Sequence, residues 1–400
     1  MVVWKKLCSI SNSICTGLNP RQNFKLNNES SIHYYVTVKE ITSNRVEFSN
    51  STDKISEEAR QIINKRSNLE PGDILFSGIG TIGKVAYVDF PTYNWDCSES
   101  VFLIKPQNEI IKGKFLYYIL LSDVVKKQYF KGASGAIMKG VRKSTLEGIQ
   151  IPIPSLEEQK RIVGILDTFT DSIENLKQQI VQRRKQYEHY RDQLLDLEGK
   201  EGVAIKSLGE LFTFKNGLNK GKEFFGKGKP IIMFTNVLYS RFIDKSMVKS
   251  KVDISDNELE RINAQVGDVF FTRTSETRED VGYASVLIDD IENCTFAGFL
   301  IRARPTTQLI LPKYCKYCFS TPQIRDSIVS KSSFTTRASL TGGGLSTVRI
   351  PIPPLSEQQR IVSILDTFEA SISNLEAQLE QRQKQYEYYR NKLLSFEEEQ

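Results

Sequence analysis

Two long segments of the chain carry apolar residues that step alternately by four and by three positions. The steps run through residues 162–197 and again through residues 361–396. This spacing places the apolar side chains on one stripe of an α-helix, and about five heptads of it are typical of a coiled coil. Each stripe has one polar position, Arg183 in the first and Arg382 in the second. Because a polar seam residue often sets the register, we predict that the two helices pair with each other.

The length of the stripe sets the scale of the predicted pair. At about 1.5 Å per residue, some 36 residues form a rod of roughly 54 Å. An antiparallel pair would carry one globular body at each end, related by a pseudo-twofold axis; the alternative is two unrelated amphipathic helices, each packed on its own domain. The predicted seam consists of Ile162, Leu166, Phe169, Ile173, Leu176, Ile180, Tyr187, Tyr190 and Leu194 in the first helix and Ile361, Leu365, Phe368, Ile372, Leu375, Leu379, Tyr386, Tyr389 and Leu393 in the second.

The two helical segments belong to an internal repeat of the whole chain. Between residues 151–195 and 350–394, 30 of 45 positions are identical. In both copies Ile-Pro-Ile-Pro must be extended, because each proline disfavours helix in the residue before it, so the helices should start near Ser155 and Leu355. The chain therefore reads as a tandem duplication. Weaker echoes are WKKLCSI (4–10) with IKSLGEL (205–211), Thr16-Gly17-Leu18 with Asn216-Gly217-Leu218, and LEPGDILFS (69–77) with AQVGDVFFT (264–272).

The remaining segments read as two α/β bodies rich in strands. Runs of β-branched and aromatic residues, separated by Gly, Asn and Pro, predict strands at 33–38, 73–77, 84–90, 99–104 and 269–274. Helical stretches at 113–130 and 312–330 each precede a glycine- and serine-rich basic loop, at 131–144 and 331–344. The predicted fold class is α+β, with globular domains at 1–150 and 200–349 joined by two long antiparallel coiled-coil helices at 151–199 and 350–400.

Composition limits the class of protein. The 400 residues are 40% hydrophobic and 26% charged, which is typical of a soluble globular protein. We find no run of eighteen apolar residues and no signal peptide in MVVWKKLCSI. Six cysteines are too few for a disulfide framework and fit a reducing compartment, so we expect the protein to be cytoplasmic.

The positive charge is concentrated in the two predicted bodies. Residues 1–150 hold 20 Lys and Arg against 14 Asp and Glu, and residues 200–349 hold 22 against 16, so each segment carries +6. The helical segments are acidic, with 7 against 9 (−2) at 151–199 and 5 against 9 (−4) at 350–400. Two basic bodies suggest two phosphate-facing surfaces, the alternative being ordinary variation in surface charge.

Three motifs resemble catalytic or metal sites without completing them. GIGTIGK at 78–84 is followed by Val85 rather than Ser or Thr, and KVAYVDF after it reads as a strand, which predicts a hairpin instead of a phosphate-binding loop. Cys315 and Cys318 form a C-x-x-C without a second pair, so we predict that they pack in a core. His33 and His189, the only histidines, have no obvious carboxylate or cysteine partner, and His189 should lie on the surface.

The loops of both bodies combine Lys and Arg with Ser, Thr, Asn and Gly. Such side chains supply contacts to phosphates and to base edges, although solvated loops have the same composition. The candidate DNA-binding residues are Ser77, Thr81, Lys84, Lys131, Ser134, Lys139, Arg142 and Lys143 in the first body and Arg273, Thr274, Ser275, Thr277, Arg278, Lys331, Arg337 and Ser339 in the second.

The order of body, helix, body and repeated helix resembles the DNA-specificity (S) subunit of type I restriction–modification enzymes. The resemblance covers essentially the whole chain. It is carried by PSLEEQKRIVGILD (154–167) and PPLSEQQRIVSILD (353–366), with GDILFSGIGTIG (72–83) and GDV (267–269) in support. The second body lacks the GIGTIG segment.

The resemblance implies two target recognition domains that each read one half of a split double-stranded DNA site. It also implies that the helices act as a spacer and dock two modification subunits, which use S-adenosylmethionine. Restriction subunits would add ATP- and Mg²⁺-dependent translocation and cleavage. This chain would then be a non-catalytic subunit with no cofactor of its own. The alternatives are an enzyme with an unrecognised site and a scaffold whose bodies bind proteins.

A change in helix length would test the spacer interpretation. Inserting or deleting one heptad at about residues 177–183 keeps the seam in phase and should change the gap between the two half-sites while both half-site sequences stay the same. Methylome mapping of cells that carry each variant would report the preferred gap. An unchanged gap would contradict the interpretation.

Overall fold

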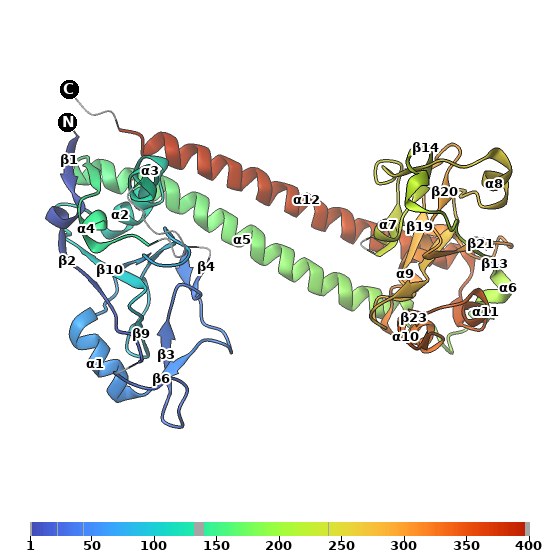
Figure 1. Cartoon of the computed structure of the whole chain (residues 1–400), viewed down its shortest axis with the longest axis horizontal. Helices are drawn as coiled ribbons and strands as arrows, with labels where there is room; N and C mark the ends of the chain where they lie inside the picture. The colour runs from blue at the N-terminus through green and yellow to red at the C-terminus, as the bar shows by residue number, and fades with distance from the viewer. Residues whose placement is uncertain (1, 22, 43, 132–139, 239, 397–400) are drawn as a thin grey trace. The chain divides into compact units, whose positions relative to one another are not determined.

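The structure is a computed structural model that describes residues 2–21, 23–42, 44–131, 140–238 and 240–396. The chain divides into two compact units, residues 1–177 with 377–400, and residues 178–376. Each unit contains one globular body and one stretch of each long helix, α5 (Leu156–Leu195) and α12 (Leu355–Leu393) (Figure 1). No helix within the described residues is long and apolar enough to cross a membrane.

The body of the first unit is built on an antiparallel sheet of four strands in the order β2-β10-β7-β8. A smaller sheet, β6-β3-β9, carries α1, and β1 pairs with β11 next to the start of α5. The bounds are β1 Val3–Lys6, η1 Leu7–Ile10, β2 Ser11–Thr16, β3 His33–Val36, β4 Ile41–Thr42, β5 Arg45–Val46, β6 Lys54–Ile55, α1 Glu57–Ser67, β7 Ile74–Ser77, β8 Val85–Tyr87, β9 Trp95–Cys97, β10 Val101–Pro106, α2 Gly113–Leu120, α3 Asp123–Lys131, α4 Lys143–Glu147 and β11 Gln150–Ile153.

The body of the second unit repeats this plan with one more strand, in the order β13-β21-β17-β19-β15. The pair β12-β24 corresponds to β1-β11, and two further sheets are β16-β14-β20 and β18-β23-β22. The bounds are β12 Ala204–Ser207, α6 Leu208–Leu211, β13 Phe212–Asn216, η2 Lys222–Phe224, β14 Phe225–Ile232, α7 Phe234–Leu238, β15 Phe242–Ile243, β16 Lys251–Val252, α8 Asp256–Arg261, β17 Val269–Thr272, β18 Thr274–Ser275, β19 Ala284–Leu287, β20 Thr295–Phe296, β21 Leu300–Pro305, α9 Pro312–Cys318, α10 Pro322–Ser330, β22 Ser333–Phe334, β23 Ala338–Ser339, α11 Gly342–Ser346 and β24 Arg349–Ile352.

The shared Gly-Asp sequence begins the central strand of each sheet in the same way. Gly72 and Gly267 have φ of +101° and +89°, a conformation that a side chain disfavours. The buried carboxylate of Asp73 accepts the backbone N–H of Glu70, and Asp268 accepts that of Gln265. Each carboxylate also pairs with a cation on the neighbouring strand, at 2.8 Å from Lys105 for Asp73 and 2.6 Å from Arg304 for Asp268. The turn and the strand pairing are thus fixed together, and the tandem repeat predicted from the sequence is confirmed.

The helical stretches predicted at 113–130 and 312–330 are each two helices, α2 with α3 and α9 with α10. A hydroxyl at each break, Ser122 or Thr321, donates a hydrogen bond to the carbonyl oxygen three residues earlier. Pro322 begins α10, where its missing N–H costs nothing. The apolar period continues across each break, so the pattern alone predicts one helix instead of two.

The two long helices pack on each other and on the body in each unit. In the first unit Phe169 stacks on Tyr389, with ring centroids 5.4 Å apart. In the second unit Tyr190 stacks on Phe368 at the same distance, and Arg184 pairs with Glu376, so α12 numbers fall as α5 numbers rise and the helices are antiparallel. Twelve of the eighteen predicted seam residues also pack in the hydrophobic core of the body of their unit, and the other six, Leu176, Ile180, Tyr190, Leu375, Leu379 and Tyr389, are not part of these cores. The structure therefore combines the two arrangements considered from the sequence.

The polar seam residues lie at equivalent places in the two units. The Arg382 guanidinium lies 5.7 Å from the ring centre of Phe169, and the Arg183 guanidinium lies 5.9 Å from that of Phe368. Among the seam positions, Ile162, Leu166, Ile180, Tyr187, Ile361, Leu365 and Tyr386 are buried, Phe169, Ile173, Leu176, Leu194, Phe368, Ile372, Leu375, Leu379 and Leu393 are half-buried, and Tyr190 and Tyr389 are exposed apart from their stacked faces.

Two equivalent glycines provide a test of this repeated architecture. A Cβ atom at Gly17 would lie 1.6 Å from the carbonyl oxygen of Cys97, and one at Gly217 would lie 2.0 Å from that of Ala297. Replacing either by alanine should therefore force backbone movement and lower the free energy of unfolding by about 1–3 kcal/mol or more. Gly164→Ala in α5, where nothing lies within 4 Å, is the control and should be neutral or stabilising by up to about 1 kcal/mol. Urea unfolding would measure the free energy of unfolding of the three variants. Equal values for all three would contradict this account.

Candidate nucleic-acid interface

A buried glutamine fixes each body to the start of its long helix. The Gln159 side chain in α5 accepts the N–H of Lys112 at 2.9 Å and donates to the carbonyl oxygens of Ile110 and Pro154, both at 3.0 Å. Gln358 in α12 makes the same three contacts, with Leu311, Leu309 and Pro353. Both side chains are completely buried. This explains why Glu-Gln recurs in both copies of the helical motif.

An aspartate eight residues, or about two turns, further along each helix forms a second attachment. Asp167 accepts the Tyr118 hydroxyl at 2.7 Å and pairs with Lys114 at 2.8 Å. Asp366 accepts the Tyr317 hydroxyl at 2.5 Å, with the Lys313 ammonium 3.6 Å away. The Ile-Leu-Asp-Thr-Phe sequence thus keeps an anchor that both bodies use. What the bodies do not share lies in their loops.

The first unit brings the two predicted binding loops side by side. Residues 78–84 form the loop of the β7–β8 hairpin, as predicted from the sequence. Ile79 makes an isolated β-bridge with Gly140, and the N–H of Val141 donates to the carbonyl oxygen of Gly78 at 2.8 Å. The hairpin loop and the end of the loop after α3 therefore form one surface.

The side chains of the first set divide into structural and accessible ones. Ser77 is fully buried; its hydroxyl donates to the Thr81 carbonyl oxygen and accepts the Lys84 N–H, so it shapes the loop and is not free to contact DNA. The Lys84 ammonium donates to the Val38 carbonyl oxygen at 2.8 Å. The exposed members are Thr81, Lys131, Arg142 and Lys143, of which Lys143 lies 3.6 Å from Glu147. Ser134 and Lys139 lie outside the described residues.

The second unit joins the corresponding loops through a three-stranded sheet, β18-β23-β22. Thr274 pairs with Ser339, and Ser275 pairs with Ala338. β22 and β23 form a short two-stranded ribbon whose loop, residues 335–337, is exposed. The loop after β17 and the loop after α10 therefore meet here as their counterparts do in the first unit.

The cationic and hydroxyl side chains of the second set lie on or beside this sheet. Arg278, Lys331 and Arg337 are exposed, and Arg337 lies 3.6 Å from the exposed carboxylate of Glu276. The Thr277 hydroxyl donates to Asp280 at 2.7 Å. The half-buried members are Arg273, Thr274, Ser275 and Ser339.

In both units, a buried hydroxyl at the end of the strand before the hairpin loop holds the two ends of that loop together. Thr272 corresponds to Ser77: its hydroxyl donates to the Asp280 carbonyl oxygen at 2.8 Å and accepts the Tyr283 N–H at 2.9 Å. Six residues separate Ser77 from Lys84, whereas ten separate Thr272 from Tyr283. The same clamp therefore holds loops of different length and sequence.

Arg325 holds the loop between β17 and β19 of the second unit in place. It is not among the DNA-binding residues predicted from the sequence. Its guanidinium donates to the carbonyl oxygens of Val281 at 3.0 Å and Glu279 at 2.7 Å, and it lies over the Tyr283 ring. Burial lowers the pKa of this guanidinium. The signal was weak, because one arginine in the amphipathic helix α10 reads as a solvated residue.

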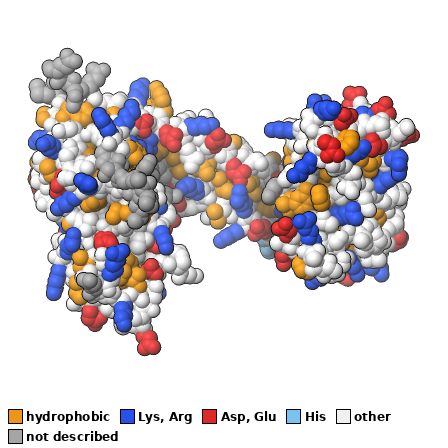
Figure 2. Space-filling view, in the orientation of Figure 1, with side chains coloured by type: hydrophobic (Ala, Val, Ile, Leu, Met, Phe, Trp, Pro, Cys, Tyr) orange, Lys and Arg blue, Asp and Glu red, His pale blue; other side chains and the backbone are white. Residues whose placement is uncertain are grey.

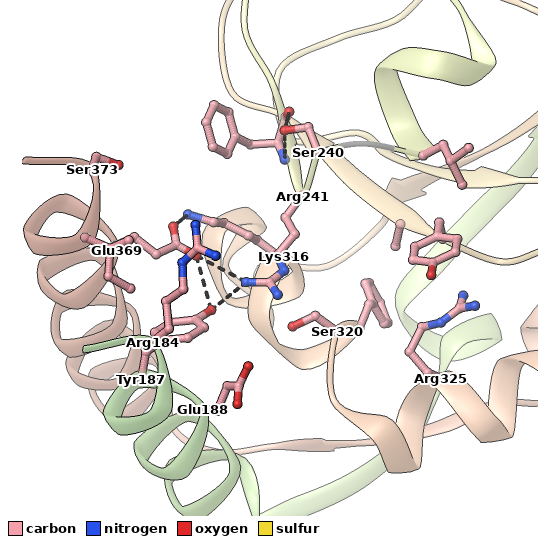
Figure 3. Close-up of a pocket in the computed structure, with 16 residues that line it drawn as sticks. Arg184, Tyr187, Glu188, Ser240, Arg241, Lys316, Ser320, Arg325, Glu369 and Ser373 are labelled. Carbon is pink, nitrogen blue, oxygen red and sulfur yellow. Dashed lines mark hydrogen bonds and ion pairs between the residues drawn. The ribbon is translucent and has the colours of Figure 1, made fainter. Parts of the chain in front are cut away.

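Arg325 lines a cavity of about 680 Å³ between the second body and its helix pair (Figure 3). On the helix side, the Tyr187 hydroxyl accepts from Arg241 at 2.6 Å and lies 3.2 Å from Glu369. Glu369 also pairs with Lys316 at 2.5 Å (Figure 3). The cations on this side therefore act within a structural network that anchors the body.

Neither histidine nor cysteine builds a metal site. No group of three or more His, Cys, Asp and Glu side chains within the described residues could hold a metal ion. Cys315 and Cys318 are buried in the core of the second unit, as predicted, and His189 is exposed. The prediction that His33 lacks a carboxylate partner is wrong: its Nε2 lies 2.7 Å from Glu57, because the β3–β6 pairing brings the start of α1 next to β3.

Surface charge alone does not mark the interface. On the face shown in Figure 2, Lys and Arg side chains of each unit are interspersed with Asp and Glu. The paired loops are distinguished instead by their equivalent construction in the two units and by their basic and hydroxyl side chains. A fold with two such bodies on paired helices is that of a two-headed recognition protein.

The chain belongs to the type I restriction–modification DNA specificity family. The family model, "Type I restriction modification DNA specificity domain", matches residues 5–183 and 200–383, one match for each repeat. The chain is 25% identical over 343 residues to the EcoKI specificity subunit of Escherichia coli K12, covering 80% of this chain and 72% of that protein. It is 32% identical over 273 residues to the EcoR124I/EcoR124II specificity subunit of Escherichia coli, covering 62% and 63%.

Solved structures show the same fold. The S subunit of a type I restriction–modification system from Mycoplasma genitalium superposes with a TM-score of 0.57 and 17% identity, over 100% of this chain and 97% of that one. A chain from a structural study of type I complex assembly and conformational transition gives a TM-score of 0.63 and 19% identity, over 98% and 96%. The predicted fold class and family are therefore confirmed, whereas the domain bounds and the individual DNA-binding residues stay predictions.

The brace by Arg325 can be tested without DNA. Arg325→Met keeps the apolar stem but removes both hydrogen bonds to the loop, so amides at 279–282 should exchange with solvent about tenfold faster, equivalent to about 1.4 kcal/mol. Hydrogen exchange with mass spectrometry would measure this. Arg360→Met, which removes only an exposed pair with Glu357, is the control. Equal exchange in both variants would contradict the brace.

Proposed function

We propose that this chain is the specificity subunit of a type I restriction–modification complex, in which each body reads one half of a split double-stranded DNA site. The observation that carries the proposal is the equivalent pairing of two loops in both units, through Ile79 and Gly140 in one and Thr274 and Ser339 in the other. Membership of the specificity family supports the same role.

The chemistry of the paired loops suits a DNA duplex. Two-stranded β-ribbons and β-sheets read DNA in the major or the minor groove, and β22–β23 is such a ribbon with Arg337 in its loop. Exposed Lys and Arg side chains provide contacts to phosphates, and hydroxyl groups provide contacts to phosphates and base edges. Because the two loops differ in length and sequence between the units, the two bodies would read different sequences.

The long helices would set the spacing and dock two modification subunits. Exposed ion pairs recur at the start of both helices, Glu158 with Arg161 at 2.6 Å and Glu357 with Arg360 at 2.7 Å. These residues are identical between the repeats although they lie at the surface, and exposed pairs of this kind add little stability. A duplicated surface supports docking of two copies of one partner.

The reactions of the complex would be carried out by its other subunits. Modification subunits would use S-adenosylmethionine, and restriction subunits would use ATP and Mg²⁺, whereas this chain would bind DNA without a cofactor. We also propose a cytoplasmic location, which the six free cysteines support.

Removal of charge from each loop pair would test DNA binding by the full-length chain. Lys131→Gln with Arg142→Gln in the first unit, and Arg278→Gln with Arg337→Gln in the second, should each lower affinity and reduce the slope of log K against log salt by about one to two. Fluorescence anisotropy on a duplex that carries the methylated site would measure both quantities.

A matched control removes two exposed cations away from the loops. Arg161→Gln with Arg360→Gln should leave the salt slope unchanged, because these residues lie at the helix starts. If the wild-type chain, alone and with modification subunits, bound duplex DNA no better at low salt than a protein without basic loops, the proposed function would be wrong.

A further inference from the structure

We propose that Phe334 stacks on the bases of the half-site read by the second unit and unstacks one base step there. The proposal rests on the proposed DNA-binding function and adds an apolar contact that the charged and hydroxyl residues do not provide. Phe334 lies in β22, and 51% of its side chain is exposed. Single exposed apolar side chains are common on protein surfaces, so the position of this ring within the candidate interface decides its role.

The ribbon holds Phe334 at the centre of the candidate interface. It pairs with Ala338 of β23, and Ala338 in turn pairs with Ser275 of β18. Residues 333–337 are all exposed, so the aromatic ring stands on a projecting ribbon together with Arg337. The ribbon is braced on its inner side, where Ala338 and Leu340 are buried in the core of the unit.

The surroundings of the ring indicate the chemistry of its partner. Phe334 borders a surface hollow of about 460 Å³ whose other lining residues are Glu276, Thr277, Arg278 and Glu279. These neighbours are polar, whereas a protein-binding patch is usually a contiguous apolar area. The hollow holds the Arg278 cation together with two carboxylates, and Arg337 lies in the loop of the same ribbon. A flat aromatic ring beside cations matches the stacking platforms that bind nucleic-acid bases, and apolar wedges inserted from the minor groove open base steps in duplex DNA.

The first unit carries no matching aromatic residue in its sequence. The position 199 residues before Phe334 is Gly135; among the described residues, the exposed apolar side chain of the hairpin loop is the aliphatic Ile79, and the exposed Phe130 belongs to α3, before the second loop. Stacking is therefore expected in one half-site only. This asymmetry separates a specific wedge from a general deformation of DNA by both bodies.

A fluorescent base provides the direct measurement. Duplexes that carry the methylated site would be prepared with 2-aminopurine at successive positions of both half-sites and titrated with the full-length chain in its complex with modification subunits. Unstacking should raise the fluorescence at one step of the half-site read by the second unit. Phe334→Ala should abolish that rise and weaken binding about five- to hundredfold, in line with about 1–3 kcal/mol for a base–aromatic stack.

Three further variants separate stacking from other effects. Phe334→Tyr keeps the ring and should restore both signals, whereas Leu309→Ala removes an equally exposed apolar side chain near the start of α12 and should change neither. Phe334→Ala should leave the salt slope unchanged because it removes no charge, in contrast to Arg278→Gln with Arg337→Gln. A thermal melt of each variant would establish that it is folded.

The possible outcomes are distinct. If Phe334→Ala keeps the fluorescence rise and the affinity of the wild type, the proposed stacking of Phe334 is wrong, whereas the proposed DNA binding is unaffected. If it weakens the binding of modification subunits but not of DNA, the ring contacts protein and the proposal is equally overturned. If the wild-type complex does not bind the duplex at all, the proposed function itself fails.

Discussion

One buried side chain at the start of each long helix determines where each body attaches. Gln159 and Gln358 are fully buried, and each binds one backbone N–H and two carbonyl oxygens. A buried backbone group left unsatisfied costs about 1–3 kcal/mol, so a substitution that cannot make these bonds loses several of them at once. No other uncharged side chain of this length both donates and accepts through the same planar group. This requirement explains why the glutamine recurs in both copies, whereas the neighbouring Glu158 and Glu357 form ion pairs at the surface.

The residues that attach each body to its helix are the same in both repeats, whereas the residues of the loops differ. Asp167 and Asp366 bind the hydroxyls of Tyr118 and Tyr317 beyond the glutamines, so each body is held at two points along its helix. Each unit adds a contact of its own beyond the shared motif, between Arg241 and Tyr187 in the second unit and between Arg45 and Glu174 in the first. Once the frame is fixed by these polar contacts and by the apolar seam, differences in the loops need not disturb it. This explains why the helical segments of the two repeats stayed alike while the loops of the bodies diverged.

The sequence predicts the parts of the structure that depend on side-chain period and fails where backbone groups make the contact. The coiled-coil stripe, the hairpin after Ser77 and the burial of Cys315 follow from apolar spacing and turn residues. Two of the three partners of Gln159 lie 47 and 49 residues away, and all three are main-chain atoms, which carry no residue-specific signal. Ser77 shows a second limit of the sequence pattern. A serine beside a glycine-rich loop resembles a ligand-binding residue, but its hydroxyl makes both of its hydrogen bonds within the loop. Composition selects these loops, but it cannot separate the side chains that build them from those that face outward.

The buried hydroxyl at the base of each loop shows how one frame can hold different readers. Ser77 and Thr272 each bind a carbonyl oxygen and an N–H from the far side of the loop, so they close a loop of six residues in one unit and of ten in the other. The entropic cost of closing a loop rises only slowly with its length, by about 0.6 kcal/mol for each doubling. The four additional residues of the second loop therefore cost little, and Arg325 offsets part of that cost by holding two of its carbonyl oxygens. Loop length and sequence can thus change while both ends stay in place, which is the property that a protein with two different recognition bodies on one repeated scaffold requires.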